Sequence, residues 1–215
     1  MGNGEIIVLE TVKGDLSVSS DVLVASRGYW NQISTSALVA VGEYLDSNPL
    51  RRGMPREELK SKLKISSRLY SGLVRKLIQD GSLQEEGPLV LKPGHEIQFS
   101  SQQEQSVEKL LQQFAASPYS PPSIKDSKSA VGDDVYQAMV DLKLLTPVSA
   151  EVVFRTEDYH QMVGEVKELL SEVGTVSVAQ VRDHFNTSRK YVLALLEHMD
   201  EIGVTVRQGD VRRLK

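Results

Sequence analysis

The sequence predicts a mainly α-helical chain of the α+β class, built from tandem winged-helix domains. Two observations predict this fold. One pattern, an amphipathic helix followed by a stop residue and two short strands, occurs three times in 215 residues, and such a recurrence marks a repeated structural unit. Further short helices precede the copies, and a helix-turn-helix completed by a β-hairpin wing is a winged helix.

The first copy is the clearest. Residues 69–78 are predicted to be a helix, because apolar residues recur along one face. The fourfold spacing is that of Leu69, Leu73 and Leu77. Gly81 ends the helix, and residues 83–85 and 89–91 read as two strands joined by a tight turn.

The same order of elements returns near the C-terminus. The helix face is formed by Val192, Leu195, Leu196, Met199 and Ile202. Gly203 ends this helix, and residues 204–206 and 211–214 form the strands. Ser177 is the predicted cap of a short helix at 178–185, and residues 186–188 cap the next helix.

A weaker copy lies between these two. Its helix face is formed by Val135, Tyr136, Met139 and Leu142. Its strands are predicted at 144–148 and 151–154, and placing Gly81, Lys143 and Gly203 in register gives steps of 62 and 60 residues. Residues 112–132 are rich in serine and proline, and they fit either a flexible join or the second short helix of this copy.

Helices are also expected upstream in the first and last copies. They are placed at 37–46, from Met54 to Leu59, and at 159–172. The N-terminal stretch differs, because residues 5–10 and 21–25 read as a strand pair with a loop at 13–15, closing on residues 28–30. We interpret it as the end of a preceding winged helix in a longer protein. The expected division is 1–35 (remnant and linker), 36–99, 100–156 and 157–215 (three winged helices).

Composition narrows the functional classes. The chain has no cysteine, a net charge of −4 and no apolar run long enough to span a membrane. We expect a cytoplasmic monomer without membrane contact. Residues 49–99 carry 10 basic and 6 acidic side chains, so partners are better sought from local charge than from net charge.

The sequence offers no catalytic constellation. It lacks the glycine-rich phosphate loops and the Gly-x-Ser-x-Gly nucleophile turn. Its four histidines lack zinc-site spacing, and the acidic pairs at 57–58 and 133–134 fall at predicted helix starts, where the helix dipole explains them. We therefore predict no enzyme activity and no metal site.

Residues suited to binding a nucleic acid are concentrated in the last copy. Ser188, Arg189 and Lys190 fall at the start of its third helix, where free N–H groups and the dipole favour a phosphate. The wing adds Arg207, Gln208, Asp210, Arg212, Arg213 and Lys215. The acids Glu197, Asp200 and Glu201 are expected at the remote helix end. This pattern predicts a nucleic-acid site between helix start and wing, with a solvated mixed-charge surface as the alternative.

The first copy offers a competing site. Its basic residues are Arg51, Arg52, Arg56, Lys60, Lys62, Lys64 and Arg68. Two interpretations stay open for this segment, a phosphate contact with ribosomal or other RNA and an ordinary solvated helix face.

RNA fits the last copy better than DNA. A winged helix that reads the DNA major groove presents several polar side chains along its third helix. Here residues 191–196 are apolar apart from Tyr191, so only the first turn of the helix carries polar side chains suited to contacting nucleic acid. A short contact with phosphates and with one or two extruded bases of an RNA hairpin suits this pattern.

Three stretches resemble the C-terminal part of bacterial selenocysteine-specific elongation factors, the SelB family: residues 49–59, 187–191 and 202–212. The resemblance implies a GTP-binding translation factor followed by four tandem winged helices. It implies that the last one binds the SECIS hairpin of selenoprotein mRNA and tethers the factor for UGA recoding. It implies GTP and magnesium only for the absent domain, and no cofactor in this fragment.

Carried over by position, the resemblance implies an RNA-binding set in the last copy. The set is Ser188, Arg189, Lys190, Arg207, Gln208, Gly209, Asp210, Arg212 and Arg213. Asp210 either accepts a hydrogen bond from a base or only shapes the wing turn. The expected partner is an mRNA hairpin, with the ribosome as a further partner of the basic first copy. A DNA-binding transcription regulator and a protein–protein scaffold are the alternatives.

Overall fold

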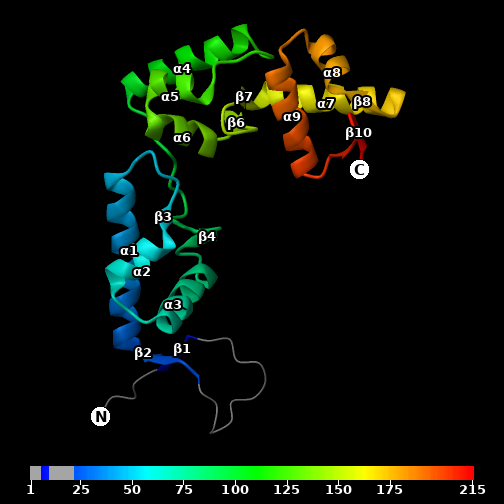
Figure 1. Ribbon diagram of the computed structural model, residues 1–215. Helices are drawn as coiled ribbons and strands as arrows, with labels where there is room; N and C mark the ends of the chain where they lie inside the picture. The colour runs from blue at the N-terminus through cyan, green and yellow to red at the C-terminus, as the bar shows by residue number, and fades with distance from the viewer. Residues whose placement is uncertain (1–5, 10–21) are drawn as a thin grey trace, which may run out of the picture. The chain divides into compact units, whose positions relative to one another are not determined.

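The computed structural model describes residues 6–9 and 22–215 (Figure 1). These residues belong to two compact units, divided between Gln98 and Phe99. The first unit holds a strand pair and one winged helix, and the second holds two winged helices. Within the described part of the chain, no helix combines the length and apolarity that a membrane span requires.

The strand pair of the first unit runs directly into a long helix. Strand β1 (Ile6–Val8) pairs antiparallel with β2 (Val24–Ser26), and α1 (Arg27–Ser47) follows at once. The Ser26 hydroxyl accepts a hydrogen bond from the Tyr29 N–H at 3.3 Å and caps this helix.

The prediction that this helix begins at residue 37, after a closing loop at 28–30, is wrong. Buried residues recur every four positions along α1: Ile33, Ala37, Val41 and Leu45. The helix starts ten residues early because no proline interrupts residues 27–47, and it crosses the expected boundary between residues 35 and 36. The expected loop at 13–15 lies outside the described residues, and the remnant interpretation stays a prediction.

The first winged helix has the predicted order of elements. These are β3 (Met54–Pro55), α2 (Arg56–Leu63), α3 (Ser67–Gln79), β4 (Gln84–Glu86) and β5 (Leu89–Leu91). The sheet is antiparallel with β5 in the middle. Leu73, Leu77 and Val90 are buried in one core with residues of α1, so the predicted apolar face of α3 is confirmed.

The middle winged helix answers the question left open at residues 112–132. Its elements are α4 (Ser101–Ala116), α5 (Ile124–Val131), α6 (Asp133–Asp141), β6 (Leu145–Pro147) and β7 (Val153–Arg155). Residues 124–131 are the second short helix, capped by the Ser123 hydroxyl. Leu142 does not join the buried face as expected, because it follows the last helical turn and is 41% exposed.

The last winged helix consists of α7 (Thr156–Val173), β8 (Val176–Ser177), α8 (Val178–Phe185), α9 (Arg189–Glu201), β9 (Thr205–Gln208) and β10 (Val211–Leu214). Ser177 forms the predicted cap, as part of a reciprocal capping box with Gln180. The buried face of α9 is confirmed except at its end. Ile202 lies beyond the last turn and is 51% exposed, contrary to the prediction.

Backbone geometry confirms the repeat. Gly81, Lys143 and Gly203 follow their helices with φ of 71°, 57° and 75°, the left-handed conformation that ends helices. A constant offset of 122 residues links the first and last copies through Lys64 and Asn186, Gly81 and Gly203, and Gly87 and Gly209, all with positive φ. The strand register follows the same offset, since Met54 pairs with Val90 and Val176 with Arg212.

Candidate nucleic-acid interface

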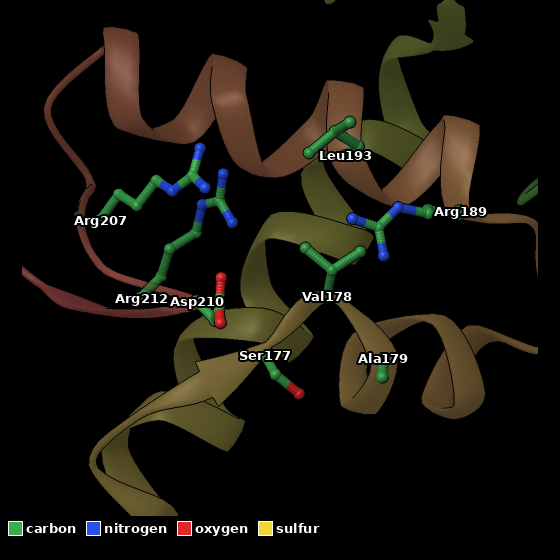
Figure 2. Close-up of a pocket in the computed structure, with 8 residues that line it drawn as sticks. All are labelled: Ser177, Val178, Ala179, Arg189, Leu193, Arg207, Asp210 and Arg212. Carbon is green, nitrogen blue, oxygen red and sulfur yellow. The ribbon is translucent and has the colours of Figure 1, made fainter.

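A pocket of about 390 Å³ opens in the last winged helix between the starts of α8 and α9 and the wing. Its lining residues are Ser177, Val178, Ala179, Arg189, Leu193, Arg207, Asp210 and Arg212 (Figure 2). The volume is at the small end of the range for ligand sites. Three guanidinium groups and one carboxylate supply the charges.

Two of the arginines reach the pocket from opposite sides. Arg189 is the first residue of α9, and Arg207 extends from β9 toward that helix (Figure 2). The Arg207 Nε donates to the Gly209 carbonyl at 2.9 Å, which ties the side chain to its own turn. Gly209 begins the two-residue loop with φ of 61°, a conformation that glycine adopts without steric cost.

The third arginine is buried rather than exposed. Arg212 is only 2% exposed, and its Nε donates to Asp200 Oδ2 at 2.8 Å. The Thr205 hydroxyl donates to the other oxygen of the same carboxylate at 2.6 Å. Arg212 Nη2 is buried and has no hydrogen-bond partner among the residues that the structure describes. Asp200 lies at the far end of α9 as expected, and the wing strand β10 brings Arg212 to its carboxylate.

Lys190 lies apart from this pocket. Its Nζ forms an ion pair with Glu151 Oε2 of the middle winged helix at 2.9 Å, and it lines a separate pocket with Ser123 and Lys125. The hydrogen bond between the paired groups lowers the pKa of the Glu151 carboxyl and raises the pKa of the Lys190 ammonium. Arg189 and Lys190 diverge because successive helical residues point about 100° apart.

Residues next to Lys190 in the sequence also form hydrogen bonds with the middle winged helix. The Thr187 hydroxyl donates to the Tyr119 carbonyl, and the Tyr191 hydroxyl donates to the Pro121 carbonyl at 2.9 Å. The Tyr119 ring packs on Phe185 with centroids 4.9 Å apart. The start of α9 thus carries two surfaces, a pocket on the Arg189 side and a domain contact on the other.

The remaining predicted residues lie around the pocket. Ser188 is the exposed N-cap residue of α9 and forms no side-chain cap. Gln208 and Arg213 are exposed on the wing and do not line the pocket. Asp210 lines the pocket and also occupies the second loop position, so the geometry is compatible with both roles considered for it.

Sequence reasoning missed four lining residues: Ser177, Val178, Ala179 and Leu193. The capping box at Ser177 was the available signal, because it fixes where α8 begins. The first turn of α8 forms part of the pocket wall and adds the positive end of its dipole to the arginines.

Several side chains of the basic segment in the first winged helix are paired with acids of the same domain. Arg52 binds Glu86, and Arg56 Nη1 lies 2.6 Å from Glu85 Oε1. Lys60 adds a pair at 3.7 Å to Glu57 Oε2 within α2. At least three of the seven basic side chains of this segment are therefore compensated inside this domain.

The offset of 122 residues compares the two sites directly. Ser67, Glu85 and Val90 stand in the first winged helix where Arg189, Arg207 and Arg212 stand in the last. One arginine position is reversed to an acid and the other two are uncharged. The three arginines that line the pocket of the last domain therefore have no basic counterpart at these positions of the first.

The fold is that of a tandem winged-helix protein, and the pocket belongs to its last domain. Residues 38–91 and 168–214 each match a family model described as "Elongation factor SelB, winged helix". Both segments thus resemble winged helices of the SelB elongation factor, which confirms the resemblance expected from the sequence.

Curated relatives agree with the family models. The chain is 26% identical over 191 residues to the selenocysteine-specific elongation factor of Haemophilus influenzae, covering 85% of this chain and 31% of the relative. It is 24% identical over 206 residues to the factor of Desulfomicrobium baculatum, covering 92% and 31%. The chain therefore spans about a third of the length of these relatives.

Two solved structures also resemble the chain. A crystal structure of bacterial selenocysteine-specific elongation factor EF-Sec aligns with a TM-score of 0.55 at 19% identity, over 92% of this chain and 32% of that one. This likeness supports the tandem fold. The mRNA-binding domain of SelB from E. coli in complex with SECIS RNA aligns with a TM-score of 0.45 at 22% identity, over 54% and 99%.

Proposed function

We propose that the last winged helix binds the SECIS hairpin of selenoprotein mRNA and thereby tethers a selenocysteine-specific elongation factor for UGA recoding. The pocket where Arg189, Arg207 and Arg212 converge is the observation that carries this proposal. All three residues lie in the segment that matches the SelB winged helix. In this proposal the three arginines bind RNA, take no part in catalysis and hold no cofactor.

In this proposal the exposed arginines hold the backbone and the pocket takes a base. Arg189 and Arg207 are exposed guanidiniums, and guanidinium groups bind phosphate with directional hydrogen bonds. Val178 and Leu193 give the pocket apolar surface for an unstacked base. Four to six phosphate contacts give a slope of log K against log salt of roughly −3 to −5, at about 0.7 to 0.9 per contact.

A DNA-binding transcription regulator is the weaker candidate. Past its first turn, α9 exposes Glu197 and Glu201, and carboxylates on the groove-facing helix repel the DNA backbone. The matching family models describe an elongation factor.

The ribosome contact is a separate part of the proposal. It places the basic segment 51–68 against ribosomal RNA and treats the chain as a monomer. Charge supports it, because residues 49–99 carry 10 basic and 6 acidic side chains. The pairs of Arg52 and Arg56 with wing acids limit how much of that charge is available.

One titration tests the proposal. The intact 215-residue chain is titrated with a SECIS-type RNA hairpin, the same stem with an altered loop, and a DNA duplex. We expect tight binding to the first, weaker binding to the second and the weakest to the third. Preference for the duplex supports the transcription regulator, and absence of salt-dependent binding supports the protein–protein scaffold.

A further inference from the structure

A polar chain lies beside the pocket of the last winged helix; two of its members are buried and the third is partly buried. Its members are Thr205, Asp200 and Arg212, joined by hydrogen bonds of 2.6 Å and 2.8 Å. Asp200 stands near the end of α9, Thr205 begins β9 and Arg212 lies in β10. The three residues therefore join the wing to the helix, and Arg212 also lines the pocket.

The other two winged helices have apolar residues at the three positions that correspond to this polar chain. In the first domain, Ile78 and Leu83 stand at the positions of Asp200 and Thr205. Val90 stands at the position of Arg212, because it pairs with Glu85 as Arg212 pairs with Arg207. The middle domain has Val140, Leu145 and Val153. The strand members of both apolar sets, Leu83, Val90, Leu145 and Val153, are at most 1% exposed.

The fold therefore does not require the polar chain. Replacing a buried ion pair with packed apolar residues of similar volume is often neutral or stabilising. Two domains of this chain have the apolar arrangement, and the domain with the pocket has the polar one. This difference indicates that the Asp200–Arg212 pair serves the pocket.

The geometry indicates what the pair does there. Asp200 holds Arg212 through Nε, so the guanidinium plane is fixed. Nη2 is left buried without a partner among the described residues, in a side chain that lines the pocket. A buried donor without an acceptor costs free energy, and an acceptor on a bound nucleotide would remove that cost.

The charge of Arg212 is compensated by Asp200, whereas Arg189 and Arg207 extend from exposed positions. We infer that Asp200 and Thr205 are positioning residues, and that they aim Arg212 at a hydrogen-bond acceptor on one unpaired base. Arg212 thus determines which loop is preferred, while the exposed arginines contribute affinity for phosphate. This inference rests on the proposed function and adds the source of its loop specificity.

The test compares two variants that remove the same charge. The probe is the RNA hairpin that the wild-type chain selects from a pool with a fixed stem and a randomised loop, together with that hairpin carrying single loop-base changes. Glu201→Gln is the control, because Glu201 is exposed on the same helix. Loss of negative charge alone strengthens RNA binding slightly, so the control should bind as tightly as wild type or more tightly.

Asp200→Asn should instead weaken binding to the selected hairpin, by roughly 10- to 150-fold if the Arg212 hydrogen bond is lost. Its affinity for the altered loops should change little, so discrimination falls, while the salt slope stays within about 0.3 of wild type. If Asp200→Asn behaves like Glu201→Gln, the inference is wrong.

A second variant separates this role from stability. D200I/T205L/R212V transfers the apolar residues of the first domain into the last. We expect a thermal midpoint at or above that of wild type, together with loss of loop discrimination. Discrimination retained in this folded variant overturns the inference. If no loop is selected by the wild-type chain, the proposed function fails instead.

Discussion

The first turn of α9 provides the sharpest test of how the chain binds RNA. Arg189 faces the pocket across from Arg207, whereas Lys190 is paired with Glu151 of the middle winged helix. Sequence reasoning assigned both residues to RNA. The structure indicates that their substitutions will differ in affinity and in salt dependence.

Arg189→Ala should remove one phosphate contact. The expected loss is about 1 to 3 kcal/mol, or roughly 5- to 150-fold in Kd. The slope of log K against log salt should become shallower by about 0.7 to 0.9, because one fewer counterion equivalent is released. Fluorescence anisotropy with a labelled hairpin at several potassium chloride concentrations measures both quantities.

Lys190→Ala is the matched comparison on the neighbouring residue. Its charge is already compensated by Glu151, so the salt slope should match wild type and the loss of affinity should be the smaller of the two. Equal changes in slope for Arg189→Ala and Lys190→Ala would refute the reasoning, since Lys190 would then have left Glu151 to bind phosphate.

Three further predictions concern stability. Burial raises the pKa of Tyr136 to about 12, and its hydroxyl lacks a partner among the described residues. Tyr136→Phe should therefore leave the urea-derived unfolding free energy unchanged or raise it by up to about 1 kcal/mol. The raised pKa makes the stability of the wild type depend on pH: the contribution of the neutral phenol is full below pH 10.0 and is lost as the pH rises toward 12. The variant, which has no phenol, should show a weaker alkaline decline. Gly209→Ala should lower stability by about 1 kcal/mol in thermal unfolding, because φ at this position is 61°; an unchanged midpoint would contradict the turn assignment. The Glu151 carboxyl has a pKa held below 4.5 by Lys190, so the pair contributes above that value and is lost as the pH falls through the folded pKa. NMR titration of the Glu151 carboxyl should show this shift in the wild type and not in Lys190→Met.

Local patterns predicted most of the fold. The fourfold spacing of Leu69, Leu73 and Leu77 and the stop at Gly81 depend only on neighbouring residues, and α3 follows them. The errors fall at element ends. Leu142 and Ile202 fit the spacing of the apolar helix face, but they lie past the last helical turn. The spacing of apolar residues alone could not show that the helix had already ended there.

The site was predictable in its charges but not in its pairings. Arg189 and Arg207 were identifiable as cations at a helix start and on a wing. The partner of Lys190 lies at position 151, in another domain, and no local pattern relates the two. The sequence correctly placed Asp200 at the far end of α9, but it could not show that the wing strands return there and bring Arg212 to the Asp200 carboxylate.

Composition alone favoured a different domain from the one that carries the arginine-lined pocket. The first winged helix has the greater excess of basic residues, yet its wing carries Glu85 and Glu86, which pair with Arg56 and Arg52. The last winged helix has Arg207 where the first has Glu85. That single reversal removes an internal partner and adds a cation at the pocket. Because the potential at a site depends on which charges remain uncompensated there, the position of the acids distinguishes the two domains better than the number of lysines and arginines.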